Sequence, residues 1–197
     1  MDPVSVLDYR YGTEEMRNVF RANSYLNFLL EVEATLAEAQ AEIGIVPKDA
    51  AVQIRNGIPL VKRERVEEIE SEINHDVMAV VKGLEEQVGE AGKWIHFGAT
   101  SYDIVDTARA LQHKKAINLI EEALTNLIAS IGKLAEEHKD TVMLGRTHGQ
   151  WATPITFGLK MAVFASELAR HMERLIQLKP RILTVSYTHL RAHETGY

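Results

Sequence analysis

The chain has 197 residues, 46% of them hydrophobic, which is enough for one substantial core and a second small domain. Its 28 acidic and 22 basic residues give a net charge of -6, so the broad positive field that attracts nucleic acid or an anionic membrane surface is missing. Cysteine is absent, which excludes disulfides, thiolate metal sites and cysteine nucleophiles and suits a reducing compartment. The sequence begins without a basic region followed by an apolar run, and no stretch approaches roughly 18 uninterrupted apolar residues, so we expect a cytoplasmic protein.

Helices dominate the expected secondary structure, because only 5 prolines and 12 glycines interrupt a chain rich in helix-forming residues. Apolar residues recur every three or four positions from residue 23 to 43 and predict an amphipathic helix that Gly44 ends. A short helix is expected over residues 49–55, and a third helical stretch over 63–88 changes polarity at Asn74. The fold class is therefore predicted to be all-α.

The longest apolar pattern covers residues 101–138 and predicts a helix of about 55 Å. Thr153 and Pro154 have the pattern of the cap and first turn of another long helix, which runs to about residue 178. Two long helices joined by residues 140–152 indicate a helical bundle. Their wide apolar stripes would stay partly uncovered in a monomer, so we expect a homo-oligomer.

One candidate catalytic residue, His148, lies in the connection between these two helices, flanked by Arg146, Thr147, Gly149 and Gln150. Glycine permits close backbone approach, and the polar neighbours can hold oxyanions. The functional interpretation is a proton-transfer histidine in an anion pocket, because imidazole titrates near neutral pH. A loop histidine that only caps a helix is an equally weighted alternative.

A second motif precedes the longest predicted helix. Gly98, Thr100 and Ser101 resemble an anion cradle, since free amides and hydroxyls at a helix N-terminus attract a carboxylate or phosphate. His96 could add positive charge to this cradle. The alternative is that Ser101 or Asp103 simply caps the helix.

The third motif is Asn74-His75-Asp76, within the third helical stretch. On a helix the last two side chains point about 100° apart, so they form no acid-base pair by themselves. A metal site is disfavoured, because no second histidine stands three or four residues away. A solvated helix face is the plain alternative.

The N-terminal segment Tyr9-Arg10-Tyr11 is the weakest signal taken alone. A guanidinium fork suits bidentate contact with phosphate or carboxylate. An arginine near a terminus is more often just solvated.

In this order and at these separations, the four motifs and the segment 30–34 (Leu-Glu-Val-Glu-Ala) resemble the fumarase/aspartase superfamily, and within it the adenylosuccinate lyase family. The resemblance extends over residues 8–184. It implies β-elimination of fumarate from adenylosuccinate to give AMP, and from succinylaminoimidazole carboxamide ribotide in purine biosynthesis. It implies a nucleotide substrate and no metal or organic cofactor.

The resemblance also implies roles for individual residues. His148 is the general acid and His75 orients or assists it. Substrate contacts are implied for Arg10, Tyr11, Asn74, His75, Asp76, His96, Thr100, Ser101, Thr147 and Gln150. Among these, Thr100 and Ser101 would hold a succinyl carboxylate and His96 would lie near the phosphate. Family members are homotetramers whose active sites combine three chains, so His75 and His148 need not meet within one chain.

The resemblance has gaps towards the C-terminal end. The family's general base is a serine on a flexible loop, and nothing in this chain matches that loop. We therefore expect a helical N-terminal domain over 1–100 with the substrate-binding and His75 motifs, an incomplete central bundle over 101–184 with the His148 loop, and a non-native tail over 185–197. His189 and His193 in this tail are given no function despite a spacing that suits a metal. This chain alone is expected to be inactive.

Two alternatives stay open. Argininosuccinate lyases and cycloisomerases share the superfamily fold, although Arg10 and His96 favour a nucleotide substrate. A non-catalytic helical assembly module is the alternative from another class. Three polar motifs among the apolar helices argue against such a module, because a purely structural protein does not need them.

Overall fold

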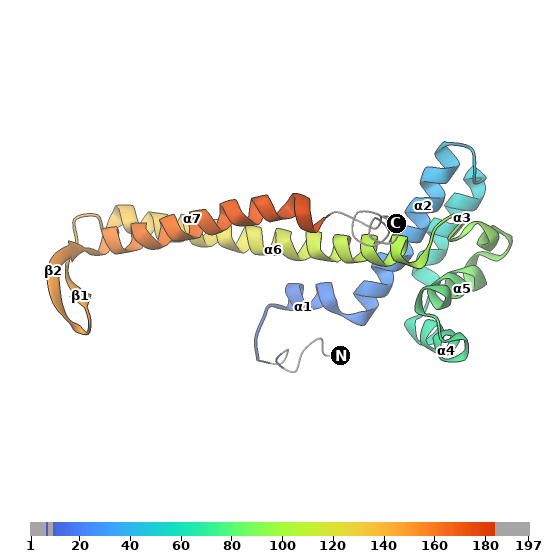
Figure 1. Ribbon diagram of the computed structural model, residues 1–197, viewed down its shortest axis with the longest axis horizontal. Helices are drawn as coiled ribbons and strands as arrows, with labels where there is room; N and C mark the ends of the chain where they lie inside the picture. Colours follow the sequence, from blue (N-terminus) through green and yellow to red (C-terminus); the bar gives the residue numbers. More distant parts are fainter. Residues whose placement is uncertain (1–6, 8–9, 184–197) are drawn as a thin grey trace, which may run out of the picture. The chain divides into compact units, whose positions relative to one another are not determined.

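The computed structural model describes Leu7 and residues 10–183. These residues fall into two compact units, one reaching to Lys115 and one formed by Ala116–Ile182. The boundary lies inside the longest helix, α6 (Ser101–Glu137), which is drawn from green to yellow in Figure 1. The domain boundary that the sequence analysis placed between residues 100 and 101 stays a prediction. The all-α fold class is confirmed, since helices make up nearly all of the described secondary structure.

The first unit begins with α1 (Glu14–Phe20), α2 (Ala22–Glu42), α3 (Lys48–Gly57) and the 3-10 turn η1 (Ile58–Leu60). Thr13 starts α1, because its hydroxyl accepts a hydrogen bond from the Met16 amide at 3.3 Å. The predicted helices over 23–43 and 49–55 are confirmed as α2 and α3, and α1 was not predicted.

The predicted helical stretch 63–88 is two helices, α4 (Arg63–Ile73) and α5 (Asp76–Val88), followed by η2 (Gly89–Trp94). Asn74 ends α4 in the left-handed conformation at φ 53°, which asparagine tolerates better than most residues. The third motif therefore lies at a helix junction and not within one helix.

The core of the first unit is one apolar cluster contributed by α2 to α5, η2 and the start of α6. The largest fully buried apolar side chains are Leu30, Ile54, Leu84, Ile104, Val19, Val77 and Val81. Their burial makes the first unit a well-packed helical domain.

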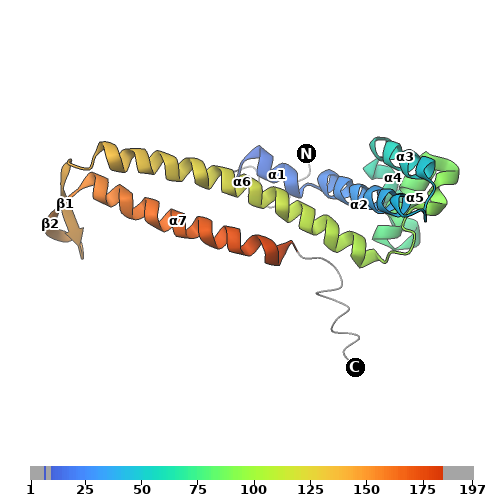
Figure 2. The same ribbon diagram turned by 90° about the horizontal axis from the view of Figure 1, so that it is seen from above.

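The second unit pairs the later part of α6 with α7 (Phe157–Ile182) through a hairpin of β1 (Val142–Thr147) and β2 (Gln150–Thr156). The two helices run antiparallel (Figure 2), and Lys179 of α7 bonds Glu121 of α6. Gly158 is required at the start of α7, since a Cβ there would lie 2.5 Å from the Ala135 carbonyl oxygen.

The predicted start of the last helix at Thr153 and Pro154 is wrong. Pro154 lies in β2 and pairs with Leu144, and α7 begins at Phe157. The Thr156 hydroxyl caps α7 instead, accepting a hydrogen bond from an amide in its first turn at 3.1 Å. The connection predicted as a loop is thus mostly an antiparallel hairpin.

Large apolar side chains of the second unit stay exposed, as the sequence predicted. Within Ala116–Ile182 they are Ile120, Leu127, Leu134, Val142, Leu144, Trp151, Leu159, Val163, Phe164, Ile176 and Leu178. Among the described residues, no helix is both long enough and apolar enough to cross a membrane.

Candidate active site

The start of α6 is held by a carboxylate that reaches back to it. Asp103 Oδ2 accepts the Thr100 amide at 2.8 Å and the Thr100 hydroxyl at 3.1 Å. This is the capping role that the sequence left open for Asp103. Ser101 is partly exposed and has no recorded side-chain hydrogen bond among the described residues. Of the two predicted anion ligands, Ser101 is therefore the one whose hydroxyl is uncommitted.

The imidazole of His96 pairs with a carboxylate that the sequence analysis did not assign. His96 Nδ1 lies 2.7 Å from Oε1 of Glu33, whose side chain is 0% exposed. The hydrogen bond and charge of Glu33, with a smaller effect from Asp103, raise the pKa of His96, while burial opposes the rise. His96 is thus biased towards the cationic form.

A second side chain of α2 holds the same loop. Gln40 Nε2 donates to the Phe97 carbonyl oxygen at 2.6 Å. Glu33 and Gln40 stand seven residues apart, so they lie on one face of α2. Two anchors on one rigid helix therefore fix the segment that leads into Thr100.

The third motif forms the N-terminus of α5. His75 is the N-cap, and its Nδ1 accepts the Met78 amide at 3.3 Å. Asp76 Oδ1 accepts the Val77 amide at 2.7 Å. Asn74, His75 and Asp76 are all exposed, so their side chains are accessible to a ligand.

The start of α5 lies near α2 and α6 around Tyr25. Burial raises the pKa of the Tyr25 phenol, Arg109 opposes the rise, and the charges of Asp76 and Asp106 add to it. An electrostatic influence of this kind requires proximity. Asp76 of α5 and Asp106 of α6 therefore both lie within electrostatic range of Tyr25 of α2.

The N-terminal arginine motif is described only in part, because Tyr9 lies outside the described residues. Arg10 and Tyr11 are both exposed, and their amides donate to the Leu7 carbonyl oxygen at 2.8 and 3.0 Å. The Tyr11 carbonyl oxygen accepts a hydrogen bond from Arg17 at 3.2 Å.

His148 belongs to the second unit, at the tip of the β1–β2 hairpin. His148 and Gly149 have φ values of 48° and 72°, as in the two-residue turns that match the twist of a hairpin. Thr147 and Gln150 pair across the base of this turn, and both are exposed. The hairpin thus presents the imidazole to solvent, flanked by the two predicted polar neighbours.

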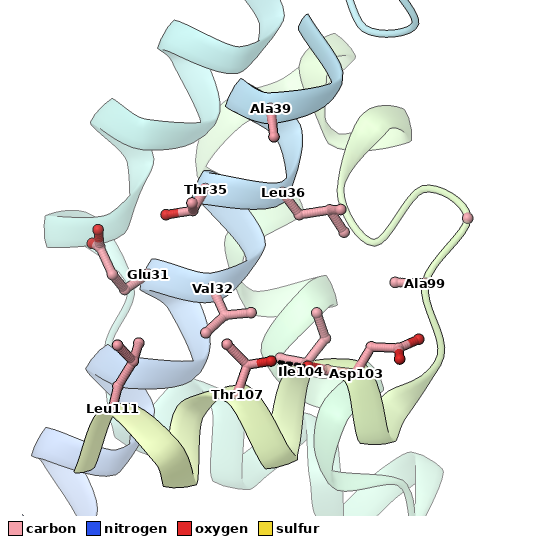
Figure 3. Close-up of a pocket in the computed structure, with 11 residues that line it drawn as sticks. Glu31, Val32, Thr35, Leu36, Ala39, Ala99, Asp103, Ile104, Thr107 and Leu111 are labelled. Carbon is pink, nitrogen blue, oxygen red and sulfur yellow. Dashed lines mark hydrogen bonds between the residues drawn. The ribbon is translucent and has the colours of Figure 1, made fainter. Parts of the chain in front are cut away.

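A cavity of about 600 Å³ lies between α2 and the start of α6 in the first unit. In Figure 3, Val32 and Leu36 of α2 face Ile104 of α6 across it. Its lining includes Gly98 and Asp103 but not the side chains of the predicted anion site. The cavity is mainly apolar, so it does not itself provide the charge complement for a phosphate or carboxylate.

Across the part of the chain that the structure describes, no group of three or more histidine, aspartate or glutamate side chains is arranged to hold a metal ion. His189 and His193 lie outside that part.

Comparison with known proteins identifies the family. The chain matches the family described as Lyase over residues 8–191. It belongs to this lyase family. The adenylosuccinate lyase of Pyrococcus abyssi is 51% identical to the chain over 182 residues, which are 91% of this chain and 40% of that protein. The chain therefore spans about 40% of the length of the curated relative it matches. The resemblance to adenylosuccinate lyases found in the sequence motifs is confirmed.

Solved structures share the fold. The fumarate lyase from Mesorhizobium sp. BNC1 has a TM-score of 0.80 and 39% identity, covering 89% of this chain and 43% of that one. The 3-carboxy-cis,cis-muconate lactonizing enzyme from Pseudomonas putida has a TM-score of 0.81 and 33% identity, covering 92% of this chain and 43% of that one.

Sequence reasoning missed Glu33 and Tyr25. Glu33 carried a usable signal, because it occupies a core-facing position of α2 between Leu30 and Ala37. A carboxylate on an apolar helix face is rarely buried without a partner. That pattern predicts a buried ion pair, but not which residue completes it.

Proposed function

We propose that this chain contributes to a carbon-nitrogen lyase that eliminates fumarate from adenylosuccinate and from succinylaminoimidazole carboxamide ribotide. The observation that carries the proposal is the 51% identity to an adenylosuccinate lyase over 182 residues. Membership of the lyase family over most of the chain supports the same reaction class.

The reaction breaks the bond between the succinyl carbon and the purine-side nitrogen. A base removes the proton from the neighbouring carbon, the electron pair forms the C=C bond of fumarate, and the nitrogen leaves with a proton from an acid. We assign the acid to His148, whose imidazole is exposed on a hairpin turn and is free to approach a ligand. His75, an exposed N-cap, is assigned the orienting role. The base is assigned to a part of the enzyme outside this chain.

Substrate anions are assigned to the first unit. Ser101, with an uncommitted hydroxyl at the start of α6, suits a succinyl carboxylate. His96, biased towards a cation, suits the phosphate. Contacts with Arg10, Tyr11, Asn74, Asp76, Thr100, Thr147 and Gln150 complete the proposed set.

The proposed assembly is a cytoplasmic homotetramer with sites shared between subunits. The exposed apolar side chains of the second unit support association, since contiguous apolar surface is usually covered. The absence of cysteine suits a reducing compartment. No metal or organic cofactor is proposed, because protein donors alone can hold the substrate charges.

A second candidate function is cycloisomerisation of a carboxylated muconate. It is favoured by the likeness to the Pseudomonas putida lactonizing enzyme, at a TM-score of 0.81. The two candidates differ in the need for a phosphate group, so a phosphate-free substrate separates them.

The decisive experiment uses the full-length protein that carries this segment. Replacing His148 with alanine is expected to lower kcat by about 10² to 10⁴, with KM for adenylosuccinate changed far less. The control is His171→Ala, which removes an exposed histidine of α7. Unchanged kcat in His148→Ala, or turnover of a muconate in place of adenylosuccinate, contradicts the proposal. Fumarate release is followed by ultraviolet absorbance.

A further inference from the structure

We propose that Glu33 is a positioning residue, which keeps His96 cationic and leaves its Nε2–H available to an anionic group of the substrate. The inference rests on the proposed function for the identity of that anion. It concerns a residue pair that joins α2 to the loop before α6, 63 positions apart in the sequence.

The burial of Glu33 needs an explanation. Its side chain is 0% exposed, and its neighbours on the same face of α2 are Leu29, Leu30 and Ala37. Burying a carboxylate costs several kcal/mol unless it is paired, and apolar residues of similar size are usually at least as stabilising. Glu33 Oε1 bonds His96, whereas Oε2 is buried with no hydrogen-bond partner among the described residues. If Glu33 served only to fill the core, its buried carboxylate would destabilise the fold.

The geometry at His96 indicates a role for the Glu33 carboxylate. A cationic imidazole has two N–H donors, and Glu33 occupies only the one at Nδ1. Across the described residues, Nε2 has no recorded hydrogen bond, and 15% of the His96 side chain remains exposed. The second donor is therefore available to a ligand.

The backbone at His96 is also held in an uncommon state. Its φ is 60°, in the left-handed region that side chains other than glycine rarely adopt. The Glu33 bond to the ring and the Gln40 bond to the Phe97 carbonyl oxygen both fix this segment. Strain that is held by two bonds from one helix is typical of segments that position a functional group.

The charges around His96 act in one direction. Glu33 from α2 and Asp103 from α6 both favour the cation and raise the pKa of His96, and only burial opposes them. Glu33 acts through a direct hydrogen bond and through its charge, whereas Asp103 acts through its charge alone. Removing the Glu33 charge should therefore lower the pKa of His96 without removing Asp103 or the loop.

The test uses the 197-residue chain, its Glu33→Gln variant and inorganic phosphate as the probe. Glutamine keeps the shape and an acceptor for the ring N–H but loses the charge. The pKa of His96 is followed by NMR of its ring signals, and phosphate is titrated at pH 7 and at a pH one to two units lower. Glu38→Gln is the matched control, since it makes the same change on α2 at a carboxylate that bonds Arg55.

In the unmodified chain, we expect His96 to titrate above the ordinary value of about 6.5 and its Nε2 signal to respond to phosphate. In Glu33→Gln, the pKa should fall and phosphate affinity at pH 7 should drop about tenfold, as for a lost charge-assisted hydrogen bond. Lowering the pH should bring the affinity of the variant to that of the unmodified chain measured at the same pH, because the ring then takes up a proton unaided. Glu38→Gln should behave as the unmodified chain.

Three results overturn the inference. They are a His96 pKa at or below its ordinary value in the unmodified chain, no phosphate response there, or a Glu33→Gln defect that lower pH does not restore. The first two need no variant, so they hold even if Glu33→Gln does not fold. The proposed function fails separately: if full-length protein releases no fumarate while phosphate binding depends on Glu33 as expected, the lyase assignment is wrong and the positioning role stands.

Discussion

The two units of this chain use their apolar residues differently. In the first unit, leucine, isoleucine and valine side chains from α2 to α6 form one cluster that is almost wholly shielded from water. Within Ala116–Ile182, the buried residues are Ala116, Ile117, Gly145 and Gly158. In α7, the side chains of Leu159, Phe164 and Leu178 remain about half exposed. The first unit thus contains its own core, whereas the second presents apolar surface that further protein must cover to give equal stabilisation.

The difference extends to the candidate site. The first unit anchors its site residues by bonds from a neighbouring helix, as Glu33 and Gln40 do for the His96 loop. In the described part of the second unit, His148 is held by the turn and by the strand pairing beside it. The proposed anion-binding groups therefore lie on a packed domain, and the proposed acid lies on a hairpin.

The largest expected effect comes from replacing one leucine by alanine in each unit and comparing the losses of stability. Leu84→Ala should lower the free energy of unfolding by about 2 to 5 kcal/mol, because Leu84 is 0% exposed and leaves a cavity. Leu127→Ala, at a residue 45% exposed, should change it by no more than about 0.5 kcal/mol. Urea unfolding measures both. Equal losses would show that the second unit also has a formed core.

The next effect tests the close approach of Gly158 to the end of α6, in the second unit. Gly158→Ala should destabilise the pairing of α6 with α7 by about 1 to 3 kcal/mol, since its Cβ would lie 2.6 Å from the Lys139 Cα. Amide hydrogen exchange in α7 should quicken, while exchange in α3 and α5 should not. Unchanged protection of α7 contradicts the close approach.

A smaller effect of opposite sign is expected at Gly132, also in the second unit. A Cβ at this α6 position meets nothing within 4 Å, so alanine adds no clash. Gly132→Ala should stabilise the helix by about 0.5 to 1 kcal/mol, because the unfolded chain loses freedom. A raised midpoint in thermal unfolding followed by circular dichroism checks this. A lowered midpoint means that something packs on this face.

The smallest expected effect is a pH dependence in the first unit. The pKa of His96 is raised in the folded state by Glu33, so the pair's stabilisation is fully present below about pH 6.5 and is lost as pH rises through the folded pKa. The unfolding free energy of the unmodified chain should fall over that range relative to Glu33→Gln. Parallel pH profiles for the two proteins contradict this coupling.

Helices were predictable where a single periodicity covers the whole element. The apolar stripes of α2 and α6 are long and regular, so their ends agree with the structure to within one residue. The hairpin was missed because its residues are mostly exposed, so no alternation of apolar and polar residues marks β1 and β2. Thr153 and Pro154 matched a helix start, but strand pairing with Leu144 prevailed.

The candidate site was predictable only in its local parts. His96, Thr100 and Ser101 are close in sequence, and glycine and hydroxyl residues beside them signal a ligand site. The partner of His96 lies 63 positions away on another helix, and periodicity carries no information about such a pairing. The helix end at Asn74 showed in the sequence only as a change of polarity, because one residue in the left-handed conformation does not alter the spacing of apolar residues.

The two-residue turn at His148 and Gly149 has a consequence for variation in chain length. Inserting one residue there would shift the pairing of Thr147 with Gln150, and side chains beyond the insertion would change faces. Point substitutions at the exposed strand positions would leave that register intact. Across homologous sequences, we therefore expect the hairpin outside Thr147, His148 and Gln150 to vary in residue type but not in length, even though surface connections elsewhere usually accept insertions.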